Sequence, residues 1–541
     1  MVNPEKLTPS LASDISKKSP VNNVYGAEDA IKEQSRLHKQ AEAMERNNES
    51  KIDIPQIEQE IASSSSGFET LQKENKKLDF ANWESVFQYQ SVLKPKLSDK
   101  EIESWSQSYL SKKESGHLWM LTDNAIGEIE ELTVTNPELK PGAEVIAITK
   151  VFHDRKIIIV CPEVLRKDEN LFKEKFKSQL KKEGVKSTEN IEFRFSDDRL
   201  DRWSRDNFLS VYDFKEGKKV FLRSASAKAE FKGKFTEDIV SQDSTRRSKQ
   251  EIAPFYFEGG DIRAIGPYLF VGEETFEKAA KDEQLRNKEL PELIPTAVAD
   301  NGPDINPELS ARKKSKPSAE ELLAQKKLKK ELEQSFGRKV IVVGEMDEYA
   351  QAVFHLDMFV TFLPNADGKP TVVIGDMEQS KNILKNTPAE TLDQTSRNVL
   401  SSQILVGMET TLSRPFSDII KELENNFHLK VLQKRMDAAA EWFIKNGFDV
   451  VRMPTLFTYN DQMHRAYNNA LVETYMNEKG TLERKIYLPT FGVSPVEAEI
   501  VKKYNELGYE VTPVPGLAKA ATLRGSLNCL TSERRKPFKR N

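Results

Sequence analysis

Four short segments place polar, reactive side chains inside stretches that otherwise resemble strands. Their sequences are WSRDNF (203–208), FEGGDI (257–262), FHLDMF (354–359) and RGSLNCLT (524–531). Together they contain a thiol, an imidazole and several carboxylates, the groups from which nucleophilic and acid–base catalysis is built. Catalysis by these groups requires a fold that brings the four segments together.

The third segment places His355 and Asp357 two residues apart. On a strand both side chains would project from one face, while Phe354, Leu356 and Met358 would project from the other. We therefore expect a strand with one face in the core and the other lining a cavity. For these two residues alone, the structural alternative is a histidine hydrogen-bonded to a nearby acid.

The two cysteines of the chain have different surroundings. Cys161 ends an apolar strand predicted at 156–160 and is expected to be inert. Cys529 follows a Gly-Ser pair and has Asn528 beside it, which is typical of a polar loop. In the second segment Glu258 directly precedes two glycines, where the backbone can approach another group closely. A simple hairpin turn is the alternative there.

In this order the four segments resemble the guanidine-modifying superfamily, which includes arginine, agmatine and peptidylarginine deiminases, dimethylarginine hydrolases and amidinotransferases. The HLD sequence at 355–357 is similar to the histidine segment of arginine deiminases, and EGGD at 258–261 is similar to the EGGD of deiminases. Residues 485–492 with 523–531 resemble the end of agmatine deiminases. The resemblance covers residues 144–531. It departs at Asn528, where agmatine deiminases commonly have a histidine.

The resemblance implies a five-bladed, pseudo-fivefold α/β propeller of ββαβ units around a central active site. It also implies a role for each reactive group. Asp206 and Asp357 would bind a guanidinium, whose donors match a carboxylate in bidentate fashion. Cys529 would attack the guanidinium carbon as a thiolate. His355 would protonate the departing nitrogen and then activate water, and Glu258 would orient His355.

The activity so implied is that of a deiminase, a hydrolase that converts an arginine-type guanidinium to a ureido group and ammonia through an amidino-cysteine. The chemistry requires no metal and no organic cofactor. An amidinotransferase would use Cys529, His355 and Glu258 in the same way but pass the amidino group to an amine. An inactive propeller that only binds partners is the non-enzymatic alternative, and the complete set of reactive groups argues against it. The expected partner is a guanidino compound, either a small arginine derivative or a protein-bound arginine, and the extra segments of the chain favour the latter. The oligomeric state stays open.

Strands and amphipathic helices must position these groups, and they alternate from residue 144 onward, which predicts an α/β protein. The clearest unit is a helix that begins at Ser494 with Pro495 in its first turn and ends before Gly508. Other helices are predicted at 170–182 and from Ser318 to before Gly337. The predicted strands are 144–151, 156–160, 191–195, 207–212, 219–223, 339–343, 371–374, 449–453, 485–488 and 509–512.

Composition divides the chain into three parts. Residues 1–77 contain only two aromatic side chains and are expected to form a largely disordered arm, because they cannot bury enough apolar area to offset chain entropy. Residues 78–115 are expected to form a small helical appendage. Residues 116–541 would be the catalytic domain, with an insertion at 285–337 and a mainly helical segment at 377–446.

Charge and cysteine content exclude several classes of protein. The 81 Lys and Arg against 85 Asp and Glu leave a net charge of −4, which gives no basic surface for nucleic acid. Two cysteines without a CxxC motif argue against a disulfide framework and against a multi-thiolate zinc site. The longest apolar run, 157–161, is too short for a membrane span, and the N-terminus lacks a signal-peptide core. We therefore expect a cytoplasmic protein with no nucleic-acid or membrane partner, whose basic residues at 534–540 lie in solvent.

Overall fold

The computed structural model describes residues 119–535, apart from 122–123, 197–199, 201, 214–217, 225–228, 244–247, 254, 288–318, 345–350, 366–368, 394–395, 397–399, 401, 405–410, 414–415 and 459–463. The predicted arm 1–77, the predicted appendage 78–115 and most of the predicted insertion 285–337 lie outside the described residues. No helix of the described part of the chain is long and apolar enough to span a membrane.

The described strands form five sheets of three or four strands and two small hairpins. The first sheet, in spatial order, is β1 (Trp119–Leu121), β5 (Leu209–Asp213), β6 (Lys218–Arg223) and β7 (Ser248–Ile252). The next two are β10 (Lys339–Val343), β9 (Tyr268–Gly272) and β8 (Ile262–Ile265), and then β11 (Val360–Leu363), β12 (Thr371–Asp376) and β15 (Val450–Pro454). The last two are β18 (Leu471–Met476), β19 (Leu482–Pro489) and β20 (Glu510–Val514), and then β21 (Thr531–Arg535), β2 (Ile129–Thr135), β3 (Lys156–Pro162) and β4 (Ile191–Ser196).

Each of the five larger sheets contains an antiparallel pair of strands followed by a parallel neighbour. Parallel pairing requires a crossover connection, and helices supply it in every sheet. These helices are α6 (Ala143–Val151), α7 (Glu169–Lys182), α8 (Ala229–Ser241), α9 (Glu273–Asn287), α11 (Ala319–Phe336), α12 (Met377–Asn386), α14 (Phe416–Asn425), α15 (Phe427–Lys445) and α16 (Ser494–Glu506). The α/β class predicted from the sequence is therefore confirmed, whereas the closed five-bladed propeller stays a prediction.

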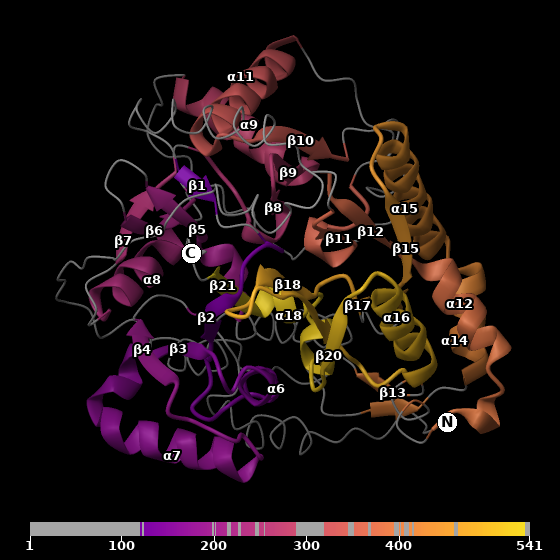
Figure 1. Cartoon of the computed structure of the whole chain (residues 1–541), viewed down its shortest axis with the longest axis horizontal. Coiled ribbons are helices and arrows are strands. Elements are labelled where there is room, and N and C mark those ends of the chain that lie inside the picture. Colours follow the sequence, from indigo (N-terminus) through magenta and orange to yellow (C-terminus); the bar gives the residue numbers. More distant parts are fainter. Residues whose placement is uncertain are drawn as a thin grey trace, which may run out of the picture.

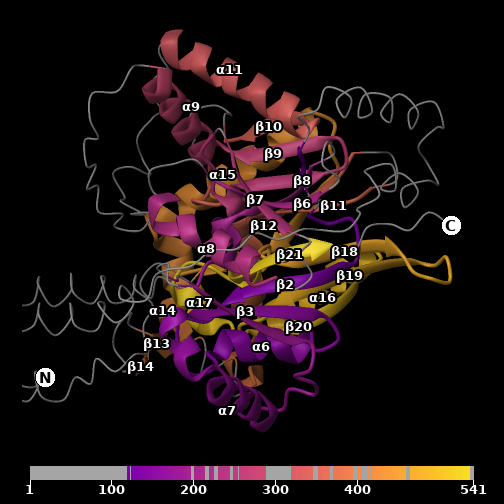
Figure 2. The ribbon, with the colours of Figure 1, turned by 90° about the vertical axis from the view of Figure 1, so that its left-hand side faces the viewer.

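Most of the longer helices, such as α7, α11, α14 and α15, lie toward the outside of the molecule (Figure 1). Turned by 90°, α9 and α11 occupy one end of the view and α6 and α7 the opposite end (Figure 2). The short helix α18 (Leu527–Leu530), which carries Cys529, lies near the middle of the first view. The largest apolar cluster joins several sheets, as in the stacked rings of Phe270 and Phe362, whose centroids are 4.0 Å apart.

Residues 144–151, predicted as a strand, form most of helix α6, so this prediction is wrong. The segment AEVIAITKV contains several β-branched residues, which favour strands. In the structure Val145 and Ile148 are buried on one side of the helix, and the Thr149 hydroxyl donates to the Val145 carbonyl at 2.8 Å. The helix is the crossover between the parallel strands β2 and β3, so tertiary packing outweighs local strand preference.

The basic residues predicted to lie in solvent at 534–540 are in part a structural strand. Arg534 and Arg535 end β21 and are buried, while residues 536–540 lie outside the described chain. Arg534 forms an ion pair with Glu131 at 2.7 Å, and Arg535 donates to the Gly127 carbonyl at 2.7 Å. A buried arginine is stable only when its charge and its N–H groups have partners. The antiparallel pairing of β21 with β2 places these partners next to Arg534 and Arg535.

Several other predictions from the sequence are confirmed. Pro495 lies in the first turn of α16, and Gly337 and Gly508 follow their helices with φ of +66° and +81°. The segment 377–446 is mainly helical as predicted but also contains the hairpin of β13 (Ser402–Ile404) and β14 (Thr411–Ser413). The second small hairpin consists of β16 (Leu456–Phe457) and β17 (His464–Arg465), and α17 (Ala518–Thr522) precedes α18.

Candidate active site

Cys529 lies in helix α18, immediately before β21, and its side chain is buried. The predicted polar loop is therefore a short helix. Asn469 holds this helix: its Oδ1 accepts from the backbone N–H of Asn528 at 2.8 Å and of Cys529 at 3.2 Å. The Nδ2 of Asn469 donates to the Cys529 Sγ at 3.2 Å. Donation to sulfur favours the thiolate, because the negative form is the better acceptor.

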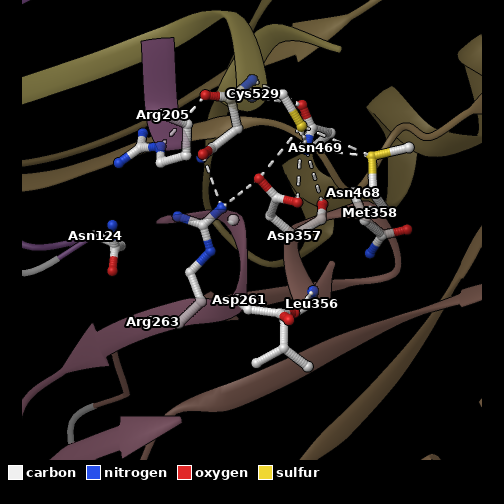
Figure 3. Close-up of polar contacts among 12 residues, drawn as sticks. Asn124, Arg205, Asp261, Arg263, Leu356, Asp357, Met358, Asn468, Asn469 and Cys529 are labelled. Atoms are coloured by element: carbon white, nitrogen blue, oxygen red, sulfur yellow. Dashed lines mark hydrogen bonds and ion pairs between the residues drawn. The ribbon is translucent and has the colours of Figure 1, made fainter. Parts of the chain in front are cut away.

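Asp357 lies beside the thiol. Its Oδ2 is 3.6 Å and its Oδ1 is 3.9 Å from the Cys529 Sγ (Figure 3). The carboxylate also forms an ion pair with Arg263, whose Nη2 is 2.8 Å from Oδ2. The side chain of Asp357 is buried, so both interactions take place away from bulk water.

His355 is paired with Glu258 on another side of the same site. Nε2 of His355 lies 2.9 Å from Oε2 of Glu258. The second oxygen, Oε1, accepts from the Tyr256 hydroxyl and lies 3.6 Å from Nζ of Lys278. These contacts hold the carboxylate in one orientation, and the carboxylate in turn holds the imidazole.

Residues 354–359 do not form the predicted strand. His355 is extended, Leu356–Met358 form the 3-10 helix η5, and β11 begins only at Val360. Oδ1 of Asp261 accepts from the Leu356 N–H at 2.8 Å and from the Gln351 Nε2 at 2.7 Å, which fixes the start of this turn. His355 and Asp357 therefore reach one site through a helical turn and not through the alternation of a strand.

The EGGD segment forms the 3-10 helix η4 (Gly259–Asp261) and not a hairpin turn. Its glycines are required by close contacts: a Cβ on Gly260 would lie 2.4 Å from Nδ1 of His355, and a Cβ on Gly259 would lie 2.0 Å from the Arg205 carbonyl oxygen. Both distances are far below a van der Waals contact. The close approach of the backbone that the sequence suggested is thus present, and its neighbour is the imidazole.

Asp206 lies in the 3-10 helix η3 (Ser204–Asn207), and its Oδ1 accepts from the Gly260 N–H at 3.1 Å. It is partly exposed. Its charge is one of those that raise the pKa of His355 and of Cys529, so it faces the same site. The structure therefore brings all five predicted site residues together, with Asp357 in contact with the thiol and Asp206 next to the glycine that touches His355.

The charges of the site favour a protonated imidazole. Burial lowers the pKa of His355, but the charge of Asp206, the nearby Cys529 and the hydrogen bond with Glu258 outweigh it and raise the pKa well above its usual value. Burial raises the pKa of Glu258, but the hydrogen bond and charge of His355 and the charge of Lys278 outweigh it, so the net pKa is lowered. Glu258 is therefore ionised and supports the imidazolium.

The surroundings of Cys529 favour its neutral thiol over the thiolate. Burial and the charge of Asp357 raise its pKa, and the proximity and charge of His355 only partly oppose them. A cation bound between Asp357 and the sulfur would favour the thiolate. The thiol of Cys161 lies in β3 with no exposed surface, and burial alone raises its pKa strongly, in agreement with the predicted inert role.

Donor atoms of His355, Asp357 and Cys529 all lie within 4.8 Å of one another. That the chemistry needs no metal or cofactor stays a prediction.

Sequence reasoning missed Arg263 and Asn469. Arg263 follows the EGGD segment by two residues, inside an apolar strand, and that position is the same kind of signal that singled out the four segments. Asn469 lies in the pair Asn468-Asn469, which is separated from the start of β18 by one residue, and belongs to no motif.

No family model matches the chain, and no curated protein is similar to it in sequence. The structure is similar to that of an agmatine deiminase from C. jejuni, with 14% sequence identity, coverage of 78% of this chain and 98% of that chain, and a TM-score of 0.43. It is also similar to the dimethylarginine dimethylaminohydrolase of Pseudomonas aeruginosa (12% identity, 75% and 100% coverage, TM-score 0.30). A third similar structure is an amidinotransferase of the saxitoxin biosynthetic pathway of Microseira wollei (12% identity, 78% and 98% coverage, TM-score 0.32).

These three proteins are members of the guanidine-modifying superfamily that the four sequence segments resemble. All three TM-scores lie below 0.5. The function proposed below therefore rests on the side chains of the site itself.

Proposed function

We propose that this protein is a guanidino-group hydrolase in which Cys529 is the nucleophile. The observation that carries the proposal is the position of Asp357, whose carboxylate lies 3.6 Å from the Cys529 sulfur. A carboxylate at this distance opposes formation of a thiolate, and a cationic substrate bound to it would relieve that opposition. A guanidinium is a planar cation whose donors match carboxylates.

In the proposed complex the guanidinium lies against Asp357 and faces Asp206, with its carbon next to the sulfur. Fixing the reacting carbon at about 3–3.5 Å from a nucleophile supplies a large part of an enzymatic rate enhancement. The positive charge of the substrate also lowers the cost of ionising Cys529. The substrate thus assists in activating its own nucleophile.

The thiolate attacks the guanidinium carbon, and the bond from that carbon to the departing nitrogen breaks as His355 protonates the nitrogen, which leaves as ammonia. The intermediate is an S-amidino-cysteine. Water then attacks the same carbon, His355 takes up its proton, and the carbon–sulfur bond breaks to release a ureido product. Glu258 keeps His355 oriented through both steps and stabilises it whenever it carries the proton.

We propose the same overall architecture that the resemblance implies, a five-bladed propeller with the site near its axis. The shared strand pattern of the five larger sheets supports this arrangement. The substrate would be an arginine derivative, either small or protein-bound. If an amine replaced water as the acceptor of the amidino group, the same residues would catalyse a transfer.

The test is product analysis after incubating the full chain with free arginine, agmatine and an arginine-containing peptide, without added amine. Hydrolysis releases ammonia and adds about 1 Da per converted guanidino group, and a trapped intermediate adds an amidino group to Cys529. Ammonia release supports the hydrolase. Turnover only after an amine is added would replace it by the transferase. No turnover with any of the three compounds under either condition would contradict both.

A further inference from the structure

Arg263 connects the two parts of the site that the proposed reaction uses. It lies on β8, and its side chain is buried. One nitrogen, Nη2, is 2.8 Å from Oδ2 of Asp357 and donates to Oδ1 of Asn528 at 2.7 Å (Figure 3). The same guanidinium thus holds the carboxylate beside the sulfur and the residue that precedes Cys529.

The other buried acid of this region, Glu533, acts on Arg263 only through its charge and has direct partners of its own. Glu533 is paired with Arg205, and its Oε1 lies 3.6 Å from Nη2 of Arg535. The second nitrogen of Arg263, Nη1, is buried and has no hydrogen-bond partner among the described residues. Among the described residues, Asp357 is therefore the carboxylate that forms the direct ion pair with Arg263.

A cavity lies next to Arg263 and Asp357, and its polar lining residues are Asn124, Arg263, Asp357, Thr361, Asn468 and Asn528. Oδ1 of Asn468 is also buried without a hydrogen-bond partner in the described part of the chain. No acidic side chain other than Asp357 lines this cavity. Nothing on that side competes with Asp357 for the charge of Arg263.

The charged groups that face the sulfur of Cys529 come from η3, from β8, and from η5 with the residue that precedes it. Asp357 of η5 and Asp206 of η3 oppose the thiolate, and His355 supports it. Arg263 of β8 is coupled to the thiolate in turn, because the negative charge of Cys529 raises the pKa of Arg263. Without a cation at Arg263, the site would place two carboxylates against one imidazole around the nucleophile.

We propose that Arg263 is a positioning residue of the guanidino reaction, which holds Asp357 by one oxygen, leaves the other oxygen to the substrate, and offsets the carboxylate charge beside the Cys529 thiolate. This inference rests on the proposed function for the substrate's place at Asp357. Its electrostatic part concerns the thiol alone and can be measured without any substrate.

The experiment measures the pH dependence of Cys529 alkylation by iodoacetamide, a neutral reagent, with the modified peptide identified by mass spectrometry. In Arg263→Met the midpoint is expected to rise by about one pH unit, which slows alkylation at neutral pH about tenfold. Arg263→Lys keeps the charge and should restore most of the shift. Asp357→Asn removes the opposing charge and should lower the midpoint.

Arg338→Met is the matched control, because Arg338 is equally buried but donates to the backbone carbonyls of Gly266 and Leu121. Its midpoint should equal that of the parent chain. An unchanged midpoint in folded Arg263→Met, or equal shifts in the Met and Lys variants, would overturn the inference. If Arg263→Met does not fold, the alkylation midpoint of Asp357→Asn is the test. A midpoint that does not fall in that variant overturns the inference. A shifted midpoint together with no guanidino turnover would instead remove the proposed function and keep the role of Arg263 toward the thiol.

Discussion

Gly260 and His355 are in direct contact, with the Gly260 Cα facing the imidazole so closely that a Cβ there would lie 2.4 Å from Nδ1 and 2.7 Å from Cγ. The imidazole is fixed on its other side by Glu258 at 2.9 Å. The ring therefore occupies a slot between a backbone and a carboxylate. This contact explains a glycine that φ alone would not require.

Gly260→Ala should displace the imidazole, because the ring cannot move away from the new methyl group without losing Glu258. We expect ammonia release to fall by about 100-fold or more, the usual scale for losing a general acid–base group. Gly480→Asn is the control, since Gly480 has φ of +75° with open space around it, and asparagine tolerates that conformation. Normal turnover in folded Gly260→Ala would show that the contact is not needed.

The two cysteines should differ completely in their effect on turnover. Cys529→Ala is expected to abolish ammonia release without lowering the thermal unfolding midpoint by more than a few degrees. Cys161→Ala should keep the activity and lose about 1 kcal/mol of stability, because it removes one buried atom from a packed strand. Turnover assays and thermal unfolding of both variants test this. Activity that survives in Cys529→Ala would rule out the covalent mechanism.

Glu258→Gln should shift the pH dependence of turnover. Glu258 raises the pKa of His355, so a neutral amide lets that pKa fall. The imidazolium is then lost at a lower pH, and the alkaline limb of the kcat profile moves downward in pH. Glu274→Gln is the matched control, because Glu274 is a more exposed carboxylate that also pairs with Lys278 at 2.9 Å. An unchanged alkaline limb in Glu258→Gln would contradict the effect of Glu258 on the pKa of His355.

Asp261 should make the protein less stable as pH rises toward neutrality. Burial raises its pKa from 3.8 to about 7, so the folded chain keeps a proton that the unfolded chain releases above about pH 4. Stability from this group is full below the unfolded pKa and is lost as pH rises through about 7. Asp261→Asn keeps an oxygen for the Leu356 N–H and cannot ionise.

The stability gained by Asp261→Asn over the parent chain should therefore grow between pH 4.5 and pH 7.5, by up to a few kcal/mol. Denaturant unfolding of both proteins at several pH values measures this difference. A difference that is constant across the range would mean that Asp261 is ionised in the folded protein throughout.

The sequence indicated which residues lie together better than it indicated the backbone that carries them. Polar groups that interrupt apolar segments drew attention to Cys529, His355 and Glu258, and the family resemblance supplied their roles. The structure brings the three side chains together, and their roles stay a proposal. The strand predicted at 355–357 was wrong because the turn there is fixed by Asp261, almost a hundred residues earlier in the chain. A pattern of neighbouring residues carries no information about such a contact.

The same limit applies to the groups that were missed. Asn469 and Arg263 act on Cys529 and Asp357 through contacts that span 60 and 94 positions of the chain respectively. The prediction of a strand at 144–151 was likewise wrong. The β-branched residues there favour a strand, but the segment connects the parallel strands β2 and β3 and forms the helix α6. In each case the deciding interaction is long-range.

The pairing of β21 with β2 has a consequence for the newly made chain. β2 ends at Thr135 and β21 begins at Thr531, so about 400 residues must be synthesised between the two partners, which takes roughly 20–80 s at ribosomal rates. Throughout that interval the outer edge of β2 has no strand to pair with, and an unpaired edge is a site for aggregation. Cys529 emerges from the ribosome just before β21. The proposed nucleophile and the strand that completes the sheet of β2 thus become available together, so under the proposed function a nascent chain cannot be active before β21 is translated.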